Sequence, residues 1–233
     1  MPDDTNLVLV PGLLCTAELF MPQMAALGET AAVTVADHTG SATLEGIAAA
    51  ILAAAPPKFA LAGLSMGGYI AFEMLRQAPG RITRLALLDT NARADRPEQA
   101  AQRRDLVALA RDKGLPAAAE LLLPFLVHRD RLSDAPLVDI VRRMATETGL
   151  EAFARQQEAI ISRPDNRPFL PSIRCPTVII VGAEDAITPV KVAEEMQAGI
   201  ADSRLEVVPE CGHLATLERP EAVNRILAEW MSR

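Results

Sequence analysis

The sequence has few cysteines and few histidines. Cys15, Cys175 and Cys211 are odd in number and widely spaced, with no C-x-x-C pair, which argues against a disulfide framework and against a zinc site. Unpaired thiols fit a reducing compartment, so we expect a cytoplasmic protein.

Concentrated basic charge and long apolar runs are also missing. Lysine and arginine total 23 against 30 aspartates and glutamates, and no stretch gathers enough of them to follow a phosphate backbone, so nucleic acid is not an expected partner. No apolar run reaches the roughly 18 residues of a membrane span. The chain opens with Asp3 and Asp4 rather than with a basic and then an apolar region, so neither a targeting signal nor a membrane partner is expected.

The chain does have enough apolar sequence for a large core. Half of its 233 residues are hydrophobic and 23% are charged, which is typical of a globular protein. A chain of this length buries roughly 70% of the surface that it exposes when extended. It therefore needs no disulfides or metal to fold.

Short runs of apolar residues alternate along the chain with longer stretches in which apolar residues recur at helical spacing. This alternation predicts a parallel sheet covered by helices on both faces. Six runs are predicted strands: 7–10, 32–36, 59–63, 82–88, 177–181 and 205–208. The last helix has Pro220 in its first turn, and its predicted buried stripe is Val223, Ile226, Leu227 and Trp230.

Residues 91–172 show no strand pattern. Helical candidates begin near Pro97, Pro116, Asp134 and Glu151. A helical stretch of this length between two strands of one sheet predicts a lid over the edge of the sheet. We therefore divide the chain into a core of residues 1–90 and 173–233 and a helical cap of residues 91–172.

The third predicted strand runs into the pentapeptide Gly63-Leu64-Ser65-Met66-Gly67, and a helix follows. In a G-x-S-x-G turn the serine has a strained backbone, and larger side chains two residues away would strike neighbouring elements. The turn also puts Ser65 at a helix N-terminus, where unpaired amides and the helix dipole favour negative charge. The strand-turn-helix context makes Ser65 a candidate nucleophile.

A serine hydroxyl needs a base to accept its proton and a third group to orient that base. His213 follows the last strand, at the same edge of the sheet as Ser65, and is the candidate base. His38 precedes the serine, against the chain order of serine, acid and histidine expected on such a sheet, and is interpreted as a loop residue or substrate contact. His128 falls in the lid and is interpreted as a solvated residue at a helix end.

Two aspartates that terminate strands are candidates for the orienting acid. Asp185 is favoured, because the loop after the fifth strand can carry it toward a histidine at the end of the neighbouring strand. Asp89 is the second candidate, and its alternative interpretation is a turn cap formed with Thr90 and Asn91.

Acyl transfer also needs two donors for the developing oxyanion, each of which lowers the barrier by about 3 kcal/mol. One is the amide after the nucleophile, that of Met66. The loop after the first strand, Pro11-Gly12-Leu13-Leu14-Cys15, offers the amide of Leu13 as the other. Cys15 itself is interpreted as packing beside the pocket.

Together these motifs resemble the α/β-hydrolase family over essentially the whole chain: the Pro-Gly-Leu loop, the serine turn, Gly182-x-x-Asp185-x-x-x-Pro189, and Gly212-His213 before the last helix. The resemblance implies an α/β fold with a six-stranded parallel sheet, helices on both faces and an inserted helical cap. It implies a triad of Ser65, Asp185 and His213, an oxyanion hole at Leu13 and Met66, and neither metal nor organic cofactor. The sequence looks most like the small esterase, lactonase and enol-lactone hydrolase branch.

Two departures from the family pattern stand out. Pro11 precedes Gly12 where the family often has histidine, which leaves the backbone donor but removes a side chain that helps to order the loop. The usual N-terminal antiparallel strand pair is absent, so the sheet should be wholly parallel. An uncovered strand edge favours self-association, and we expect a monomer or a homodimer.

The predicted reaction is hydrolysis of small to medium carboxylic esters through an acyl-enzyme. The same triad could instead open lactones or enol-lactones, hydrolyse C–C bonds, carry out perhydrolysis or act as a lyase, and a vestigial triad could serve a ligand-binding sensor. The predicted pocket wall is apolar and consists of Leu14, Met66, Leu121, Phe125, Phe153 and Leu214, although for the lid residues packing between cap helices is an equal alternative. A charged group facing Ser65 from the cap, such as Arg142 or Arg155, would favour an acid-bearing substrate.

Overall fold

Six parallel strands form one sheet in the order β2-β1-β3-β4-β5-β6 in the computed structural model, which describes residues 6–232. The strands are β1 (Asn6–Val10), β2 (Ala32–Val35), β3 (Phe59–Leu64), β4 (Ile82–Leu88), β5 (Thr177–Gly182) and β6 (Ser203–Val208). All six predicted strands are confirmed, and the largest shift is at the sixth, which begins at Ser203 rather than at residue 205.

The central strands are apolar on both faces because helices cover both sides of the sheet. Every residue of β3 and β5 is buried, whereas the edge strand β2 alternates between exposed and partly buried residues. Near-continuous apolar strands are what a parallel sheet with two covered faces requires.

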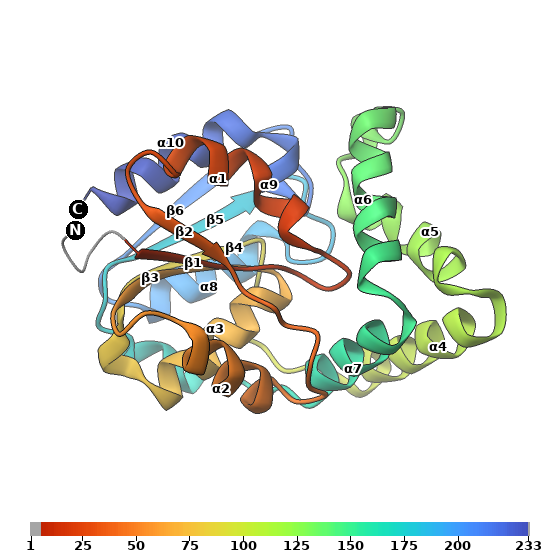
Figure 1. The fold of residues 1–233 in the computed structure, drawn as a ribbon, viewed down its shortest axis with the longest axis horizontal. Helices are drawn as coiled ribbons and strands as arrows, with labels where there is room; N and C mark the ends of the chain where they lie inside the picture. The colour runs from red at the N-terminus through yellow and green to blue at the C-terminus, as the bar shows by residue number, and fades with distance from the viewer. Residues whose placement is uncertain (1–5, 233) are drawn as a thin grey trace.

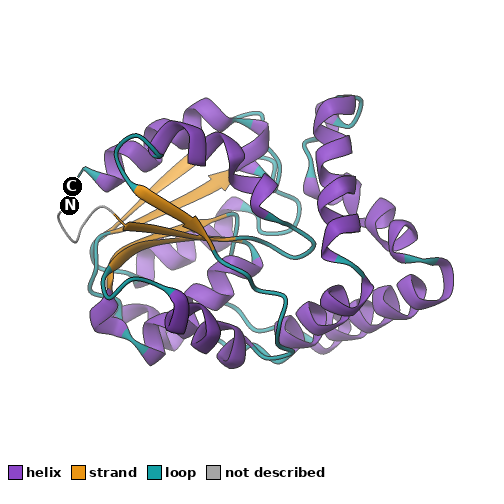
Figure 2. Ribbon diagram, in the orientation of Figure 1, coloured by secondary structure: helices purple, strands orange, loops and turns teal. Residues whose placement is uncertain are grey.

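Helices flank the sheet in two layers (Figure 2). On one side lie α2 (Leu44–Ala54), α3 (Met66–Gln77) and α8 (Val190–Gly199), and on the other lie α1 (Met21–Leu27), α9 (Ala215–Glu218) and α10 (Pro220–Met231) (Figure 1). The predicted stripe on α10 is confirmed, since Val223, Ile226, Leu227 and Trp230 are its buried residues. Short 3₁₀ turns at Ala17–Phe20 and Pro79–Arg81 lead into α1 and β4.

Between β4 and β5 the chain forms four helices that stand beyond the ends of the strands (Figure 1). These are α4 (Pro97–Lys113), α5 (Leu115–Leu126), α6 (Ala135–Thr148) and α7 (Leu150–Ile161), with 3₁₀ turns at Arg129–Arg131 and Arg167–Ser172. The helices start where proline and aspartate signals predict: Pro97 and Pro116 lie in first turns, and the Asp134 side chain accepts a hydrogen bond from the amide of Leu137. We refer to α4–α7 as the cap helices.

No helix within residues 6–232 combines the length and the apolar character that crossing a bilayer requires.

Candidate active site

Ser65 occupies a tight turn between β3 and α3, and its backbone lies in the left-handed region with a φ of 54°. Two glycines make the turn possible. A Cβ on Gly63 would lie 2.3 Å from the carbonyl oxygen of Gly67, and one on Gly67 would lie 2.0 Å from the carbonyl oxygen of Val10. The amide of Ser65 also donates to the carbonyl of Leu88 at 2.9 Å, which anchors the turn to β4.

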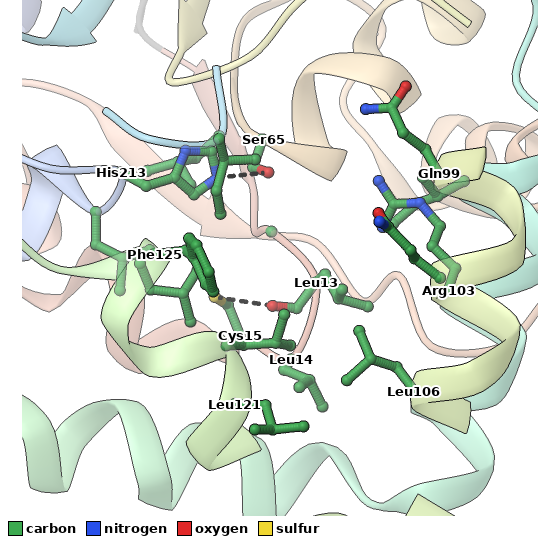
Figure 3. Close-up of a pocket in the computed structure, with 18 of the residues that line it drawn as sticks. Leu13, Leu14, Cys15, Ser65, Gln99, Arg103, Leu106, Leu121, Phe125 and His213 are labelled. Carbon is green, nitrogen blue, oxygen red and sulfur yellow. Dashed lines mark hydrogen bonds between the residues drawn. The ribbon is translucent and has the colours of Figure 1, made fainter. Parts of the chain in front are cut away.

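The structure brings Ser65, His213 and Asp185 into one hydrogen-bonded chain. Nε2 of His213 lies 2.9 Å from Oγ of Ser65 (Figure 3). Nδ1 of His213 lies 2.8 Å from Oδ2 of Asp185. His213 and Asp185 are buried, and Ser65 is half-buried. The three residues are far apart in the sequence and meet because β3, β5 and β6 end at the same edge of the sheet.

The loop after β5 holds the Asp185 carboxylate from three sides. The amides of Ile187 and Thr188 donate to Oδ1 at 2.8 and 2.9 Å, and the Thr188 hydroxyl donates to Oδ2 at 2.6 Å. Thr188 therefore supports the candidate acid, and the following helix begins two residues later at Val190. Burial alone would raise the pKa of Asp185, but the charge and hydrogen bond of His213 and the bonds from Thr188 lower it below its ordinary value.

Asp89, the second candidate acid, is not hydrogen-bonded to His213. Its carboxylate accepts hydrogen bonds from the amides of Gly182 at 2.9 Å and Ala215 at 3.1 Å, so it ties the end of β4 to the end of β5 and to α9. Burial, and then the charge of Asp185, raise the pKa of Asp89 well above its ordinary value. Of the two aspartates, only Asp185 is placed to orient the imidazole.

Glu218 is a buried carboxylate that sequence patterns do not reveal, since a glutamate on a helix is normally solvated. Its side chain accepts hydrogen bonds from the amides of Gly212 at 3.0 Å and Leu214 at 3.4 Å, on either side of His213. It also accepts from the amide of His128 at 2.8 Å. His128 is thus buried, and its interpretation as a solvated residue is wrong.

His38 and Gln156 together hold the loop after β1. His38 is buried, and its Nε2 lies 2.9 Å from the carbonyl oxygen of Gly12 and 3.0 Å from Nε2 of Gln156. Oε1 of Gln156 accepts from the amide of Leu14 at 3.2 Å. Burial lowers the pKa of His38, which favours its neutral form. His38 is a buried support of this loop and does not line the cavity described below.

The amides of Leu13 and Met66 are both available as donors beside Ser65. The Leu13 amide has no hydrogen-bond partner within residues 6–232, in contrast to its neighbour Leu14. Met66 is the first residue of α3, where amides have no intrahelical acceptor. Leu14, next to this donor, has a φ of 59°, so the loop is strained at that residue.

Ser65 and His213 open onto a cavity of about 630 Å³ between the sheet and the cap helices (Figure 3). Four of the predicted wall residues line it, namely Leu14, Leu121, Phe125 and Leu214. More than half of the surface of Leu121 and of Phe125 is exposed, 58% and 54%, which places these two at the mouth of the cavity. Most of the remaining lining is also leucine and isoleucine.

Phe153 and Met66 do not line the cavity, so their assignment to its wall is wrong. Phe153 is fully buried in α7 among apolar residues of α4, including Val107 and Ala110. The side chain of Met66 packs into the core on the α3 side of the sheet. In both cases the helix turns the side chain toward another helix or the sheet instead of the cavity.

The basic group that the cap presents to the cavity is neither Arg142 nor Arg155. Arg142 pairs with Glu120 on the surface at 2.6 Å, and Nε of Arg155 donates to the carbonyl of Thr39 at 2.9 Å. Arg103 lines the cavity instead, on α4. Sequence reasoning missed it because the spacing of charges along α4 does not show which of its faces meets the core.

Cys15 lines the cavity as expected, but burial raises the pKa of its thiol to about 12. A thiol with this pKa stays protonated at neutral pH and is a poor nucleophile. Across the described part of the chain, no three or more histidine, cysteine, aspartate or glutamate side chains are grouped to hold a metal ion.

The chain belongs to the α/β hydrolase fold family, whose model matches residues 5–220. Among solved structures, it is similar to a malate-bound thermophilic esterase from Thermogutta terrifontis, with a TM-score of 0.89 and 32% identity over 97% of this chain and 89% of that one. It is also similar to an enol-lactonase from Burkholderia xenovorans LB400, with a TM-score of 0.88 and 26% identity over 98% and 91% of the two chains.

The chain is also similar in sequence to a curated enol-lactonase. The 3-oxoadipate enol-lactonase 2 of Acinetobacter baylyi is 28% identical over 178 residues, which is 76% of this chain. The match spans 65% of that protein, just under two thirds of its length. These likenesses agree with the hydrolase branch that the sequence motifs predict.

Proposed function

We propose that the protein is a serine hydrolase that cleaves carboxylic esters through an acyl-enzyme, with Ser65, His213 and Asp185 as its catalytic residues. The observation that carries the proposal is the continuous hydrogen-bonded chain from Ser65 Oγ through the imidazole of His213 to Asp185 Oδ2. Such a chain activates a hydroxyl that is otherwise a weak nucleophile.

Each residue of the chain has one role in the proposed reaction. Ser65 Oγ attacks the ester carbonyl carbon while its proton passes to Nε2 of His213, and Asp185 stabilises the imidazolium that forms. The amides of Leu13 and Met66 donate to the oxyanion. The imidazolium then protonates the leaving alcohol as the C–O bond breaks, which leaves the acyl group on Ser65. Water, deprotonated by His213, releases the acid and restores the hydroxyl.

The cavity supports a substrate that is apolar next to the reacting carbonyl. Apolar side chains, mainly leucine, form most of its wall, and its volume suits a small or medium acyl group rather than a peptide.

Replacing Ser65 tests the proposal. We expect Ser65→Ala to lower kcat on p-nitrophenyl esters by about 10⁴-fold or more, and to abolish labelling by a fluorophosphonate probe. Ser172→Ala is the matched control, because Ser172 is exposed in the 3₁₀ turn before β5 and should behave as wild type. A wild-type protein that hydrolyses no ester of an acyl-chain series would contradict the proposal, and one that the probe also leaves unlabelled would favour a ligand-binding sensor.

Lactone opening is the second candidate, because it uses the same attack at a carbonyl and the enol-lactonase from Burkholderia xenovorans LB400 has the same fold. A panel of simple lactones, assayed beside the esters, distinguishes the two. Turnover of lactones without turnover of esters would select it.

A further inference from the structure

We infer that the α4 side of the cavity is a subsite for a carboxylate, so that the substrates are esters or lactones that have an acid group at the far end of the acyl chain. This inference rests on the proposed function for the chemistry at Ser65, but the anion site itself is defined by residues outside the triad. Its central residue is Arg103.

Arg103 and Gln99 face the cavity from the same side of α4. They lie one turn apart on the helix, and both line the cavity together with Leu106 of the next turn. Figure 3 shows both polar side chains on the side of the cavity opposite Phe125, with Ser65 and His213 forming another part of its wall. An acyl chain attached to Ser65 would therefore contact the apolar wall of the cavity along its length, and its far end would approach the polar side chains of Gln99 and Arg103.

The charges behind Arg103 do not cancel. Oδ2 of Asp95 accepts from Nε of Arg103 at 2.6 Å, and Oδ1 forms an ion pair with Nη1 of Arg163 at 2.8 Å, so two guanidinium groups share one carboxylate. The side chains of Asp95 and Arg163 are 1% and 3% exposed, and that of Arg103 is 21% exposed. Among the described residues neither arginine pairs with a second carboxylate. The cluster of Asp95, Arg103 and Arg163 thus has a net charge of +1 and little water to stabilise it, and a bound anion would neutralise it.

The donors that face the cavity are held in place but have no acceptor. Arg103 Nη1 donates to Oε1 of Gln157 at 3.0 Å, and with the bond to Asp95 this fixes the plane of the guanidinium. Within residues 6–232 its Nη2 has no acceptor, nor has the amide nitrogen of Gln99, whose Oε1 is taken by the amide of Arg96 at 3.0 Å. A guanidinium held in this way is well suited to a carboxylate, because its planar fork matches the two oxygens.

Asp105 is the one carboxylate on the same cavity wall. It is exposed to solvent, so its repulsion of an anion is screened, whereas the charge of the half-buried Arg103 is screened less. This difference gives a second way to test the subsite, because removing the charge of Asp105 should improve anion binding.

The test compares two esters of one chain length, the p-nitrophenyl half-ester of adipic acid and the same compound with its free acid capped as an amide. We expect wild-type kcat/KM to favour the acid at least tenfold, mainly through KM. Arg103→Met should lower this preference at least tenfold, and Asp105→Asn should raise it. Arg142→Met is the matched control, since Arg142 forms a surface ion pair with Glu120 away from the cavity, and it should keep the wild-type preference.

Arg103 also supports Asp95, so a second variant guards against a folding defect. Gln99→Leu leaves the guanidinium and its partners in place and removes only the hydrogen bond from the amide of Arg96 at the start of α4. It should reduce the acid preference severalfold with an unchanged circular dichroism spectrum. The inference is overturned by a wild type that does not prefer the acid, or by folded Arg103→Met and Gln99→Leu variants that both keep the preference.

A binding experiment separates this inference from the proposed function. Adipate should raise the Tm of wild type and of Ser65→Ala, and it should not raise the Tm of Arg103→Met. If neither ester is hydrolysed but adipate still raises Tm through Arg103, the anion site stands and the proposed reaction fails. If esters are hydrolysed and adipate has no effect on Tm, the anion site fails and the proposed reaction stands.

Discussion

His213 is surrounded by three buried carboxylates, and only one of them contacts its imidazole. Asp185 accepts from Nδ1, Asp89 holds the amides of Gly182 and Ala215, and Glu218 holds the amides on either side of His213. Burial disfavours a charged imidazole, yet the charge and hydrogen bond of Asp185, with the charges of Asp89 and Glu218, raise the pKa of His213 above its ordinary value. The residues that position the imidazole of His213 therefore also set its affinity for protons.

This shift predicts the pH dependence of the reaction. A general base acts only in its neutral form, so kcat/KM for a neutral ester should fall as pH decreases, with a midpoint above about 6.5, the pKa of an isolated histidine. Asp185→Asn removes the main group that raises the pKa, and it should move the midpoint to lower pH while kcat falls by about 10⁴-fold. The measurement is a pH profile of initial rates for both proteins. A wild-type midpoint at or below 6.5, or one that Asp185→Asn raises, contradicts the predicted role of Asp185.

At the scale of helices, strands and loops, the strained backbone conformations lie in the loops that follow the strands. Within residues 6–232, four residues other than glycine have a positive φ: Leu14, Ser65, Asp89 and Glu210. They lie in the loops after β1, β3, β4 and β6, all at the edge of the sheet that carries the site. Such conformations cost about 1–3 kcal/mol each and persist where the packed elements on either side hold them. The rigid strands and helices thus stabilise the strained loops in which the candidate catalytic groups lie.

The contact between α3 and β1 shows how close this packing is. A Cβ on Gly67 would lie 2.0 Å from the carbonyl oxygen of Val10 and 3.0 Å from that of Pro11, so Gly67→Ala must push the first turn of α3 away from the loop that contains Leu13. We expect a loss of about 1–3 kcal/mol in the free energy of unfolding, measured in urea, and a lower kcat because the two proposed oxyanion donors, the amides of Leu13 and Met66, separate. Gly80→Ala is the control, since nothing lies within 4 Å of a Cβ there, and it should change neither quantity noticeably. Equal effects of the two substitutions would show that the close approach at Gly67 is unimportant.

The position of the candidate triad could be predicted from sequence, because it follows from the order of strands alone. In a parallel sheet the carboxyl ends of all strands lie at one edge. Ser65, Asp185 and His213 each follow such an end, so their strand assignments alone predict that they lie at the same edge. The cap residues could not be placed in this way. Phe153 and Arg103 both lie on cap helices, and a helical pattern shows which side chains share a face but not which partner that face meets. Gln156 and Glu218 were missed for a related reason, since Gln156 accepts from the amide of Leu14 and Glu218 from that of His128, and both amides are remote in the sequence.

At the scale of the whole molecule, the cap helices share their apolar contacts with the sheet. Met144 and Val141 of α6 belong to the same buried cluster as Leu19 and Trp230, on the α10 side of the sheet. Ile160 of α7 belongs to the cluster on the α3 side. The cluster among the cap helices themselves includes Leu14 from the loop after β1. Because these clusters are continuous with the core, the cap should not unfold by itself.

Cooperative unfolding of cap and core is therefore the last prediction. In urea, fluorescence of Trp230, the single tryptophan of the chain, reports the core, and far-UV circular dichroism includes the long cap helices. We expect one transition with the same midpoint for both probes. Met144→Ala, which empties a fully buried site on α6, should lower the free energy of unfolding by about 2–5 kcal/mol and shift both probes together. Leu132→Ala, at a site on the cap that is 37% exposed, should shift them little. If Met144→Ala moved only the dichroism transition, the cap would be an independent folding unit, because the loss of its packing would then leave the surroundings of Trp230 unchanged.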